Sequence, residues 1–292
     1  MRFGKVIMEV IPSGGTHGAE IKGVDLSQPL DDVTFQAIME AFHTHSVVVF
    51  RNQCLSEQNH VDFASRIGEI DNDVYGHFSH PDHNEIIILS NILDDDGNPI
   101  GVQEAGLFWH TDLAYTQTPS RASLLYSFEI PVTDDGTVLG DTLFSNTAAA
   151  FDGLPDNIKS RIQGKTITNR HAYAYFKSGH GEQFKKSADA LHDVVHPLVI
   201  KHPFTGRKIL FCNEAMTVCI NELSETESEQ LLSFLVEHVK KPEFVYRHKW
   251  QVGDLLVWDN FPTQHSVDHN FKLPLRRRMQ RITVRGSVPR AA

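Results

Sequence analysis

The stretch Phe108-Trp109-His110-Thr111-Asp112 places a histidine and an aspartate two residues apart. If the segment from Phe108 to Tyr115 is a strand, both side chains point to the same face, because strand side chains alternate. A histidine and a carboxylate on one face can hold two positions of a divalent metal ion. A second histidine completes the two-His, one-carboxylate set that leaves positions open on non-haem Fe(II). His265, far downstream, is the candidate.

Two alternatives compete with an iron site. His110 and Asp112 could be exposed loop residues, but Asp112 sits among apolar and aromatic neighbours, where an uncompensated carboxylate is costly. Zinc hydrolases also use two histidines and a carboxylate. Such sites need a nearby general base, often within H-E-x-x-H, and this sequence contains no such motif. Zinc also leaves the later arginines unexplained.

The arginines after His265 fit a second substrate that carries a carboxylate. Fe(II) with three protein ligands keeps three positions, of which a 2-oxo acid can take two, leaving one for dioxygen. The distal carboxylate of that acid then needs a fixed cation, and the planar guanidinium of arginine binds carboxylates in a bidentate manner. Arg277 and Arg281 share a strand parity, so we expect both to face the interior, while Arg276, Arg278 and Gln280 face outward.

The remaining pattern predicts a mainly β protein with added helices, arranged as a jelly-roll barrel. Helices are expected after Asp31, from Ser56 to Gly68, over residues 155–163, and after the capping box Ser224–Glu227. Strands are expected near residues 46–50, 86–89, 108–115, 122–128, 142–144, 208–212, 254–258 and 280–284. No Pro/Gly/Ser linker divides the chain, so residues 1–292 are predicted to form one domain, with residues 164–195 as a mobile insert. Whether residues 70–85 and 164–195 form a lid is left open.

Composition limits the partners and the compartment. The chain has 292 residues and a formal net charge of −10, which argues against nucleic acid as a partner. We expect no signal peptide and no membrane association, because no apolar run is long enough for either. The three cysteines lack C-x-x-C spacing, so a reduced, cytoplasmic protein is expected.

Several segments together resemble the taurine dioxygenase and 2,4-dichlorophenoxyacetate dioxygenase family of Fe(II)/2-oxoglutarate-dependent oxygenases. They span nearly the whole chain: 18–26, 109–112, 140–143, 202–206, 213–214, 242–244, 258–260 and 277–281. The resemblance implies a double-stranded β-helix (a cupin-like jelly roll) with His110, Asp112 and His265 as iron ligands. It assigns Thr142 and Arg277 to the distal carboxylate of 2-oxoglutarate. The implied reaction consumes O2 and 2-oxoglutarate, releases succinate and carbon dioxide, and oxidises a small anionic compound, most often by hydroxylation. The family also commonly forms homodimers or homotetramers.

The substrate pocket departs from the taurine enzymes. Arg281 matches the family arginine that binds the anionic head group of the substrate. Asp73 falls near the position of a family histidine that contacts the sulfonate, and an aspartate there would repel a sulfonate. Gly106 replaces an asparagine, and Met216 and Tyr173 stand at aromatic pocket positions. Taurine is therefore a poor candidate.

The extended segment 91–106 resembles members that act on other acids, including isonitrile-forming oxygenases. Asn91 within it is a candidate cosubstrate contact and equally a turn residue. Desaturation, decarboxylation or isonitrile-type oxidation of an amino-acid-derived acid on the same iron centre is the alternative reaction. A metal- and metabolite-binding barrel without turnover is the non-enzymatic alternative.

Overall fold

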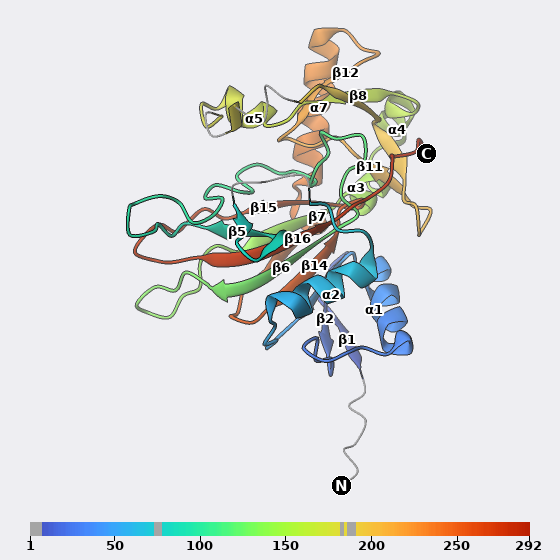
Figure 1. The fold of residues 1–292 in the computed structure, drawn as a ribbon. Helices are drawn as coiled ribbons and strands as arrows, with labels where there is room; N and C mark the ends of the chain where they lie inside the picture. The colour runs from blue at the N-terminus through green and yellow to red at the C-terminus, as the bar shows by residue number, and fades with distance from the viewer. Residues whose placement is uncertain (1–7, 73–77, 182–183, 186–190) are drawn as a thin grey trace.

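The protein is represented by a computed structural model that describes residues 8–72, 78–181, 184–185 and 191–292 (Figure 1). Its largest sheet has eight strands in the order β1-β2-β3-β14-β6-β16-β5-β4. Their bounds are β1 Glu9–Pro12, β2 Ala19–Lys22, β3 Val47–Phe50, β4 Ser79–His80, β5 His83–Ser90, β6 Ala122–Glu129, β14 Leu255–Asp259 and β16 Arg278–Val284. A three-stranded sheet, β13-β7-β15, comprises β13 Val245–His248, β7 Thr142–Asn146 and β15 Thr263–Val267. Within the described part of the chain, no helix has the length and apolarity needed to cross a membrane.

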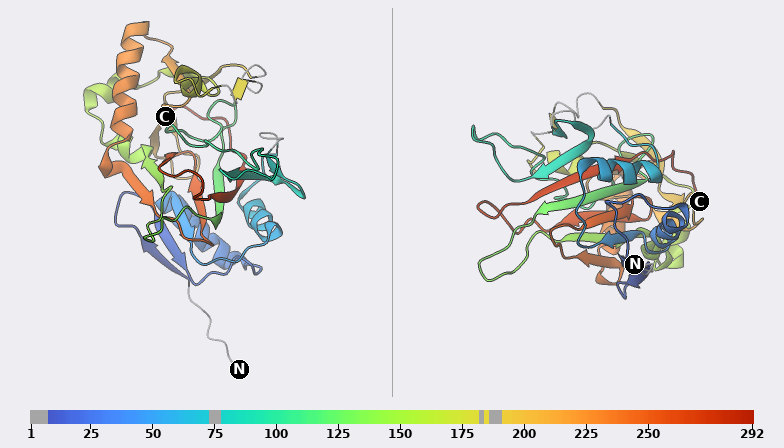
Figure 2. Two further views of the ribbon diagram at one scale, coloured as in Figure 1. Left: turned by 90° about the vertical axis from the view of Figure 1, so that its left-hand side faces the viewer. Right: turned by 60° about the horizontal axis from the view of Figure 1, so that its bottom comes forward.

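Side-chain alternation gives the eight-stranded sheet two buried faces. Val48 and Phe50 of β3 join the core formed with helices α1 (Asp32–His45) and α2 (Glu57–Ile67), which pack on one face of the sheet (Figure 2). Val47 and Val49 instead join the opposite core, together with residues such as Trp258. The expected caps are present: Asp31 accepts a hydrogen bond from Thr34 N, and Ser56 forms a capping box with Asn59.

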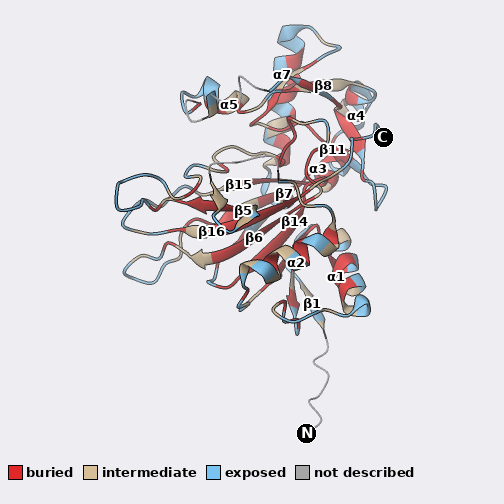
Figure 3. Ribbon diagram, viewed as in Figure 1, coloured by how far each residue is buried: buried red, intermediate tan, exposed pale blue. Residues whose placement is uncertain are grey.

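The three-stranded sheet lies over the inner face of the large sheet, and this pair of layers is the predicted jelly roll. Phe144 of β7 reaches Trp258 of β14, with ring centroids 5.4 Å apart. The central strands of the two layers are almost entirely buried (Figure 3), namely β6, β14 and β16 of the large sheet and β7 and β15 of the smaller one. The side chains on the inner face of β6 and β16 point into the barrel.

The expected strand over residues 108–115 is wrong. His110 forms an isolated bridge with His265, and the chain then turns, with Ala114 N donating to Thr111 O and Thr116 N to Leu113 O. Leu113 has a left-handed φ of 57°, which a continuing strand does not allow. The proximity of His110 and Asp112 therefore comes from a bridge followed by a turn.

Residues 164–195 contain more regular structure than the sequence pattern suggested. Strands β8 (Thr166–Asn169) and β9 (Val194–Pro197) pair with β12 (Thr217–Ile220) in a second three-stranded sheet. The remaining elements complete this end of the molecule: α3 Thr147–Asp152, α4 Asp156–Ile162, α5 Tyr173–Lys177, β10 Val199–Lys201, β11 Lys208–Leu210, α7 Glu225–Val239 and η2 Pro242–Phe244. The mobility of this segment stays a prediction.

Candidate metal and cosubstrate site

A reciprocal pair of main-chain hydrogen bonds brings the two histidines together. His110 N donates to His265 O at 3.0 Å, and His265 N donates to His110 O at 2.8 Å. Residues that exchange both bonds in an antiparallel bridge present their side chains on the same side. The two imidazole rings accordingly lie 4.1 Å apart between centroids, although 155 residues separate them in the chain.

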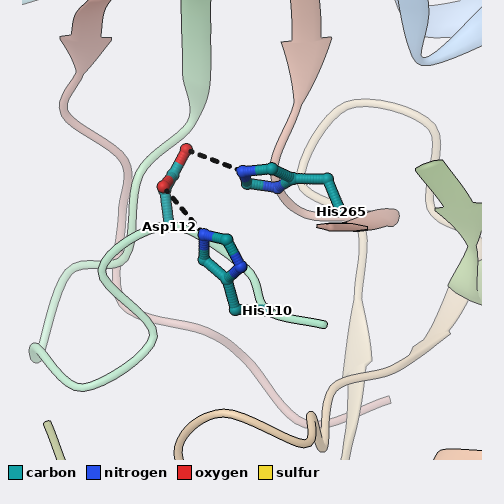
Figure 4. A group of neighbouring side chains, drawn as sticks. All are labelled: His110, Asp112 and His265. Atoms are coloured by element: carbon teal, nitrogen blue, oxygen red, sulfur yellow. Dashed lines mark ion pairs between the residues drawn. The ribbon is translucent and has the colours of Figure 1, made fainter. Parts of the chain in front are cut away.

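Asp112 completes the group from the turn that follows (Figure 4). Its Oδ1 lies 3.6 Å from His110 Nε2, and its Oδ2 lies 3.9 Å from His265 Nε2. One ligand atom from each residue falls within 4.8 Å of the others, a spacing at which all three can reach one cation. Asp112 is 3% exposed, so the carboxylate needs the compensation that a cation gives.

The protonation states suit a metal ion. Burial lowers the pKa of His265 well below its usual value, which keeps its imidazole neutral. Burial alone would raise the pKa of Asp112, but the charge of Arg281 and the contacts with His265 and His110 outweigh burial and hold that pKa well below the usual range. His110 Nδ1 lies 2.9 Å from Phe108 O, so the ring proton is assigned to Nδ1 and the Nε2 lone pair faces the centre.

Arg281 is where its strand parity predicts, buried on the inner face of β16. Its Nη1 donates to Asp112 Oδ1 at 3.1 Å, and the side chain also lines the cavity beside the three residues. Gln280 has the opposite parity and donates to Glu57 of α2 at 3.2 Å. The same arginine therefore contacts a candidate metal ligand and the cavity.

Arg277 has the features of an anion site. Its side chain is buried, and Nε and Nη2 have no hydrogen-bond partner among the described residues. Burial lowers the pKa of Arg277 to about 10, so it stays charged at neutral pH. The guanidinium lies over the Phe271 ring, 5.9 Å from its centroid, but a buried cation that lacks hydrogen bonds is costly, and a ligand carboxylate would compensate it.

Thr142 and Asn91 differ in what they offer a ligand. Thr142 Oγ1 accepts a hydrogen bond of 3.0 Å from Trp250 Nε1, which leaves the hydroxyl proton to be donated elsewhere. Asn91 uses its amide on the main chain instead: Nδ2 donates to Leu275 O, and Oδ1 accepts from Arg277 N, each at 2.9 Å. Asn91 thus holds the start of β16, and a direct contact with the cosubstrate stays a prediction.

Only some of the expected substrate contacts line the cavity beside His110, Asp112 and His265. Met216 lines it, but Tyr173 does not; Tyr173 faces a groove beside α7, and Tyr175 lines the cavity in its place. Gly106 also lines the cavity with φ +81°, and a Cβ there would lie 2.9 Å from Val267 Cγ2. An asparagine would be strained at this position. Asp73 lies outside the described residues.

Sequence reasoning missed several residues that complete the site. Ser123 donates to Asp112 Oδ2 at 2.6 Å, and Trp250 contacts Thr142. Ser123 left a signal, because it is a buried polar residue at an inward position of a largely apolar strand. Tyr175 and His171 left none, because their segment has no clear period.

Comparison with known proteins gives consistent matches. A sequence model of the family described as taurine catabolism dioxygenase TauD, TfdA family matches residues 9–283. The alpha-ketoglutarate-dependent sulfate ester dioxygenase of Pseudomonas putida is 32% identical over 291 residues, covering 97% of this chain and 91% of the relative. Pentalenolactone F synthase of Streptomyces avermitilis is 31% identical over 272 residues, covering 87% and 86%.

Solved structures share the fold over almost the whole chain. A taurine dioxygenase from Burkholderia xenovorans superposes with a TM-score of 0.80 at 31% identity, covering 97% of this chain and 90% of that one. AAD-2 in complex with Mn(II) and N-oxalylglycine has a TM-score of 0.81 at 27% identity, with coverage of 97% and 99%.

Proposed function

Because this chain belongs to the taurine catabolism dioxygenase TauD, TfdA family and is an Fe(II)- and 2-oxoglutarate-dependent dioxygenase, we propose that it hydroxylates a small organic acid with a compact apolar body. The balanced reaction converts a substrate C–H bond, O2 and 2-oxoglutarate into C–OH, succinate and carbon dioxide. Bound iron supplies the redox chemistry of this conversion.

The protein residues would bind and orient the reactants. His110, Asp112 and His265 would hold the metal ion, since imidazole nitrogens and an ionised carboxylate are ligands that coordinate iron. Arg277 would pair with the distal carboxylate of 2-oxoglutarate, and the Thr142 hydroxyl would donate a further hydrogen bond to it. These assignments rest on the buried guanidinium and on the direction of the Trp250 hydrogen bond.

The observation that supports an apolar acid is the lining of the cavity. Arg281 is its one cationic side chain in the described part of the chain, and the rest of the wall is mostly aliphatic or aromatic, including Leu89, Tyr175 and Met216. His171 also lines the cavity, but burial lowers its pKa to about 4, so it is neutral. One end of the substrate would be anionic and the rest apolar.

The same lining disfavours taurine. Taurine carries an ammonium group as well as a sulfonate, and a buried ammonium needs an anionic partner. Asp112 is the only carboxylate among the described lining residues, and it already contacts Arg281 and the two histidines. An acid without an amine avoids this penalty.

Matched substrates test the proposal without altering the protein. Arg281 contacts Asp112, so replacing Arg281 would disturb the metal site as well as the substrate site. We therefore propose to compare O2-dependent succinate formation for alicyclic and aryl carboxylic acids, their primary amides and taurine. The acids should be turned over with product equal to succinate, and the amides should be at least tenfold poorer in kcat/KM. Equal turnover of acids and amides, or preferential turnover of taurine, would contradict the proposal.

Two further predictions concern the oligomeric state and the cellular location of the protein. A homodimer or homotetramer is expected from the family resemblance, and analytical ultracentrifugation of the purified protein tests it. A cytoplasmic location is expected from the cysteine pattern, and fractionation of the source cells tests it.

A further inference from the structure

A closed ring of hydrogen bonds runs through Asp112, Ser123 and Asn260. Ser123 Oγ donates to Asp112 Oδ2 at 2.6 Å, Asn260 Nδ2 donates to Ser123 Oγ at 2.9 Å, and Asp112 N donates to Asn260 Oδ1 at 3.3 Å. The three residues are at most 3% exposed, so water does not compete for these bonds. Neither Ser123 nor Asn260 belongs to the candidate ligand set.

Two strands of the large sheet fix the ring. Ser123 lies on β6, and its register partner on β14 is Trp258, two residues before Asn260. The inward parity of Ser123 points its hydroxyl to the turn that carries Asp112. The ring therefore couples the position of the carboxylate to the rigid part of the barrel.

The direction of each bond follows from one donor. Trp258 Nε1 contacts Asn260 Oδ1 at 3.0 Å, and an indole nitrogen can only donate, so that amide atom must be the oxygen. Asn260 Nδ2 then donates to Ser123, whose single proton is left for Asp112 Oδ2. Every polar atom of the ring has one consistent role, which is how a buried network holds one geometry.

We propose that Ser123 and Asn260 are positioning residues that set the orientation of the Asp112 carboxylate for the metal ion. With Ser123 on Oδ2 and Arg281 on Oδ1, the carboxylate is held from both sides, and each oxygen keeps a lone pair for the cation. Without Ser123, Oδ2 loses its hydrogen-bond donor, and we expect the bond from Arg281 to Oδ1 to turn the carboxylate toward the guanidinium. Partners that orient ligands in this way commonly change metal affinity by about 10–100-fold when they are removed.

The test measures metal binding and needs no turnover. Mn(II) is titrated anaerobically into the metal-free full chain without 2-oxoglutarate, and free Mn(II) is followed by electron paramagnetic resonance. Ser123→Ala should raise the Kd for Mn(II) by about 10–100-fold, and Ser123→Cys, with a weak thiol donor, should fall between it and the wild type. Asn260→Asp loses the donor to Ser123 and should also raise the Kd. Combining it with Ser123→Ala should add little, because both act through one hydrogen bond.

Ser127→Ala is the matched control. Ser127 lies on the same strand with the same parity and is also buried, but its hydroxyl donates to Gln251 O at 2.6 Å. This control should lower the melting temperature as Ser123→Ala does and leave the Kd for Mn(II) unchanged. If Ser123→Ala does not fold, Ser123→Cys decides alone.

The inference rests on the proposed function, and the outcomes separate the two. A wild-type chain that does not bind Mn(II) overturns both. A wild type that binds Mn(II), with Ser123→Ala or Ser123→Cys binding equally well, overturns the positioning role alone. An equal loss of affinity in Ser127→Ala also overturns it, because the effect would then be a general weakening of β6.

Discussion

Replacing Arg277 by methionine tests whether a ligand carboxylate is the missing partner of a buried cation. Arg277 is 6% exposed, and its Nε and Nη2 lack hydrogen-bond partners in the described structure. Burial lowers the pKa of Arg277 from the usual arginine value to about 10. That difference, at roughly 1.4 kcal/mol per pH unit, corresponds to an unfavourable contribution of about 3 kcal/mol to the folded state.

The sign of this contribution follows from proton binding. The unfolded chain holds the proton more tightly, so the penalty is fully present below pH 10 and disappears as the pH rises from there toward the usual pKa of arginine. Methionine keeps much of the apolar stem without the charge. Without 2-oxoglutarate, Arg277→Met should therefore raise the free energy of unfolding, by up to about 3 kcal/mol.

With 2-oxoglutarate the effect should reverse. Thermal melts of the Zn(II)-loaded protein, which cannot turn over, should show a rise in melting temperature on adding 2-oxoglutarate in the wild type and none in Arg277→Met. Losing one partner of a buried charge pair costs about 2–5 kcal/mol, or roughly 30-fold or more in affinity. Arg276→Met is the control, since Arg276 is 55% exposed and pairs with Glu129 at the surface. The reasoning is refuted if Arg277→Met melts well below the wild type without 2-oxoglutarate and still responds normally to it.

Three further changes test other parts of the structure. Trp250→Phe removes the donor to Thr142 and should raise the KM for 2-oxoglutarate by about 2–10-fold at constant kcat, the range of one hydrogen bond; steady-state kinetics with an unchanged KM would contradict this. Met216→Ala should widen the cavity and shift succinate formation toward bulkier acids, at a stability cost of about 2–5 kcal/mol; an unaltered order of substrates would place Met216 outside the substrate site. His60 is a buried residue of α2, and burial lowers its pKa to about 3. Below pH 6.5 the unfolded chain therefore binds a proton that the folded chain does not, and the free energy of unfolding should fall by about 2 kcal/mol between pH 6.5 and 5. In urea unfolding, His60→Leu should lack that part of the pH dependence. If the free energy of unfolding falls equally with pH in the variant and the wild type, the role assigned to His60 is refuted.

The sequence was sufficient to single out the three residues that the structure brings together, but not to predict how they come together. His110 and Asp112 were expected to share a face because of strand alternation, whereas a bridge and a turn at Leu113 bring them together. The turn is held by contacts with distant segments, such as Asp112 N donating to Asn260 Oδ1 and the bridge between His110 and His265. Local periodicity carries no information about such pairings.

For the cavity residues, too, local sequence does not predict which side chains face the site. Tyr173 and Tyr175 are two positions apart on the short helix α5, and composition does not distinguish which one faces the cavity. The choice is made by tertiary contacts: Tyr175 donates to Glu104 O and accepts from Leu107 N, each at 3.2 Å, so it packs against the segment that carries Gly106. Ser123 and Arg281, by contrast, follow from inward parity on long, regular strands.

This division explains why the reaction is better determined than its substrate. His265, Thr142 and Ser123 lie on strands of the barrel, and His110 is hydrogen-bonded to one of them, so their geometry follows from the fold. The lining beyond them comes from connecting segments around residues 102–106, 171–175 and 215–216, where a change of one side chain does not disturb the sheets. Relatives at 31–32% identity can therefore share the fold while their names point to compounds as different as sulfate esters and pentalenolactone F. In this chain the apolar connecting segments, and not the charged strand residues, should decide which acid is oxidised.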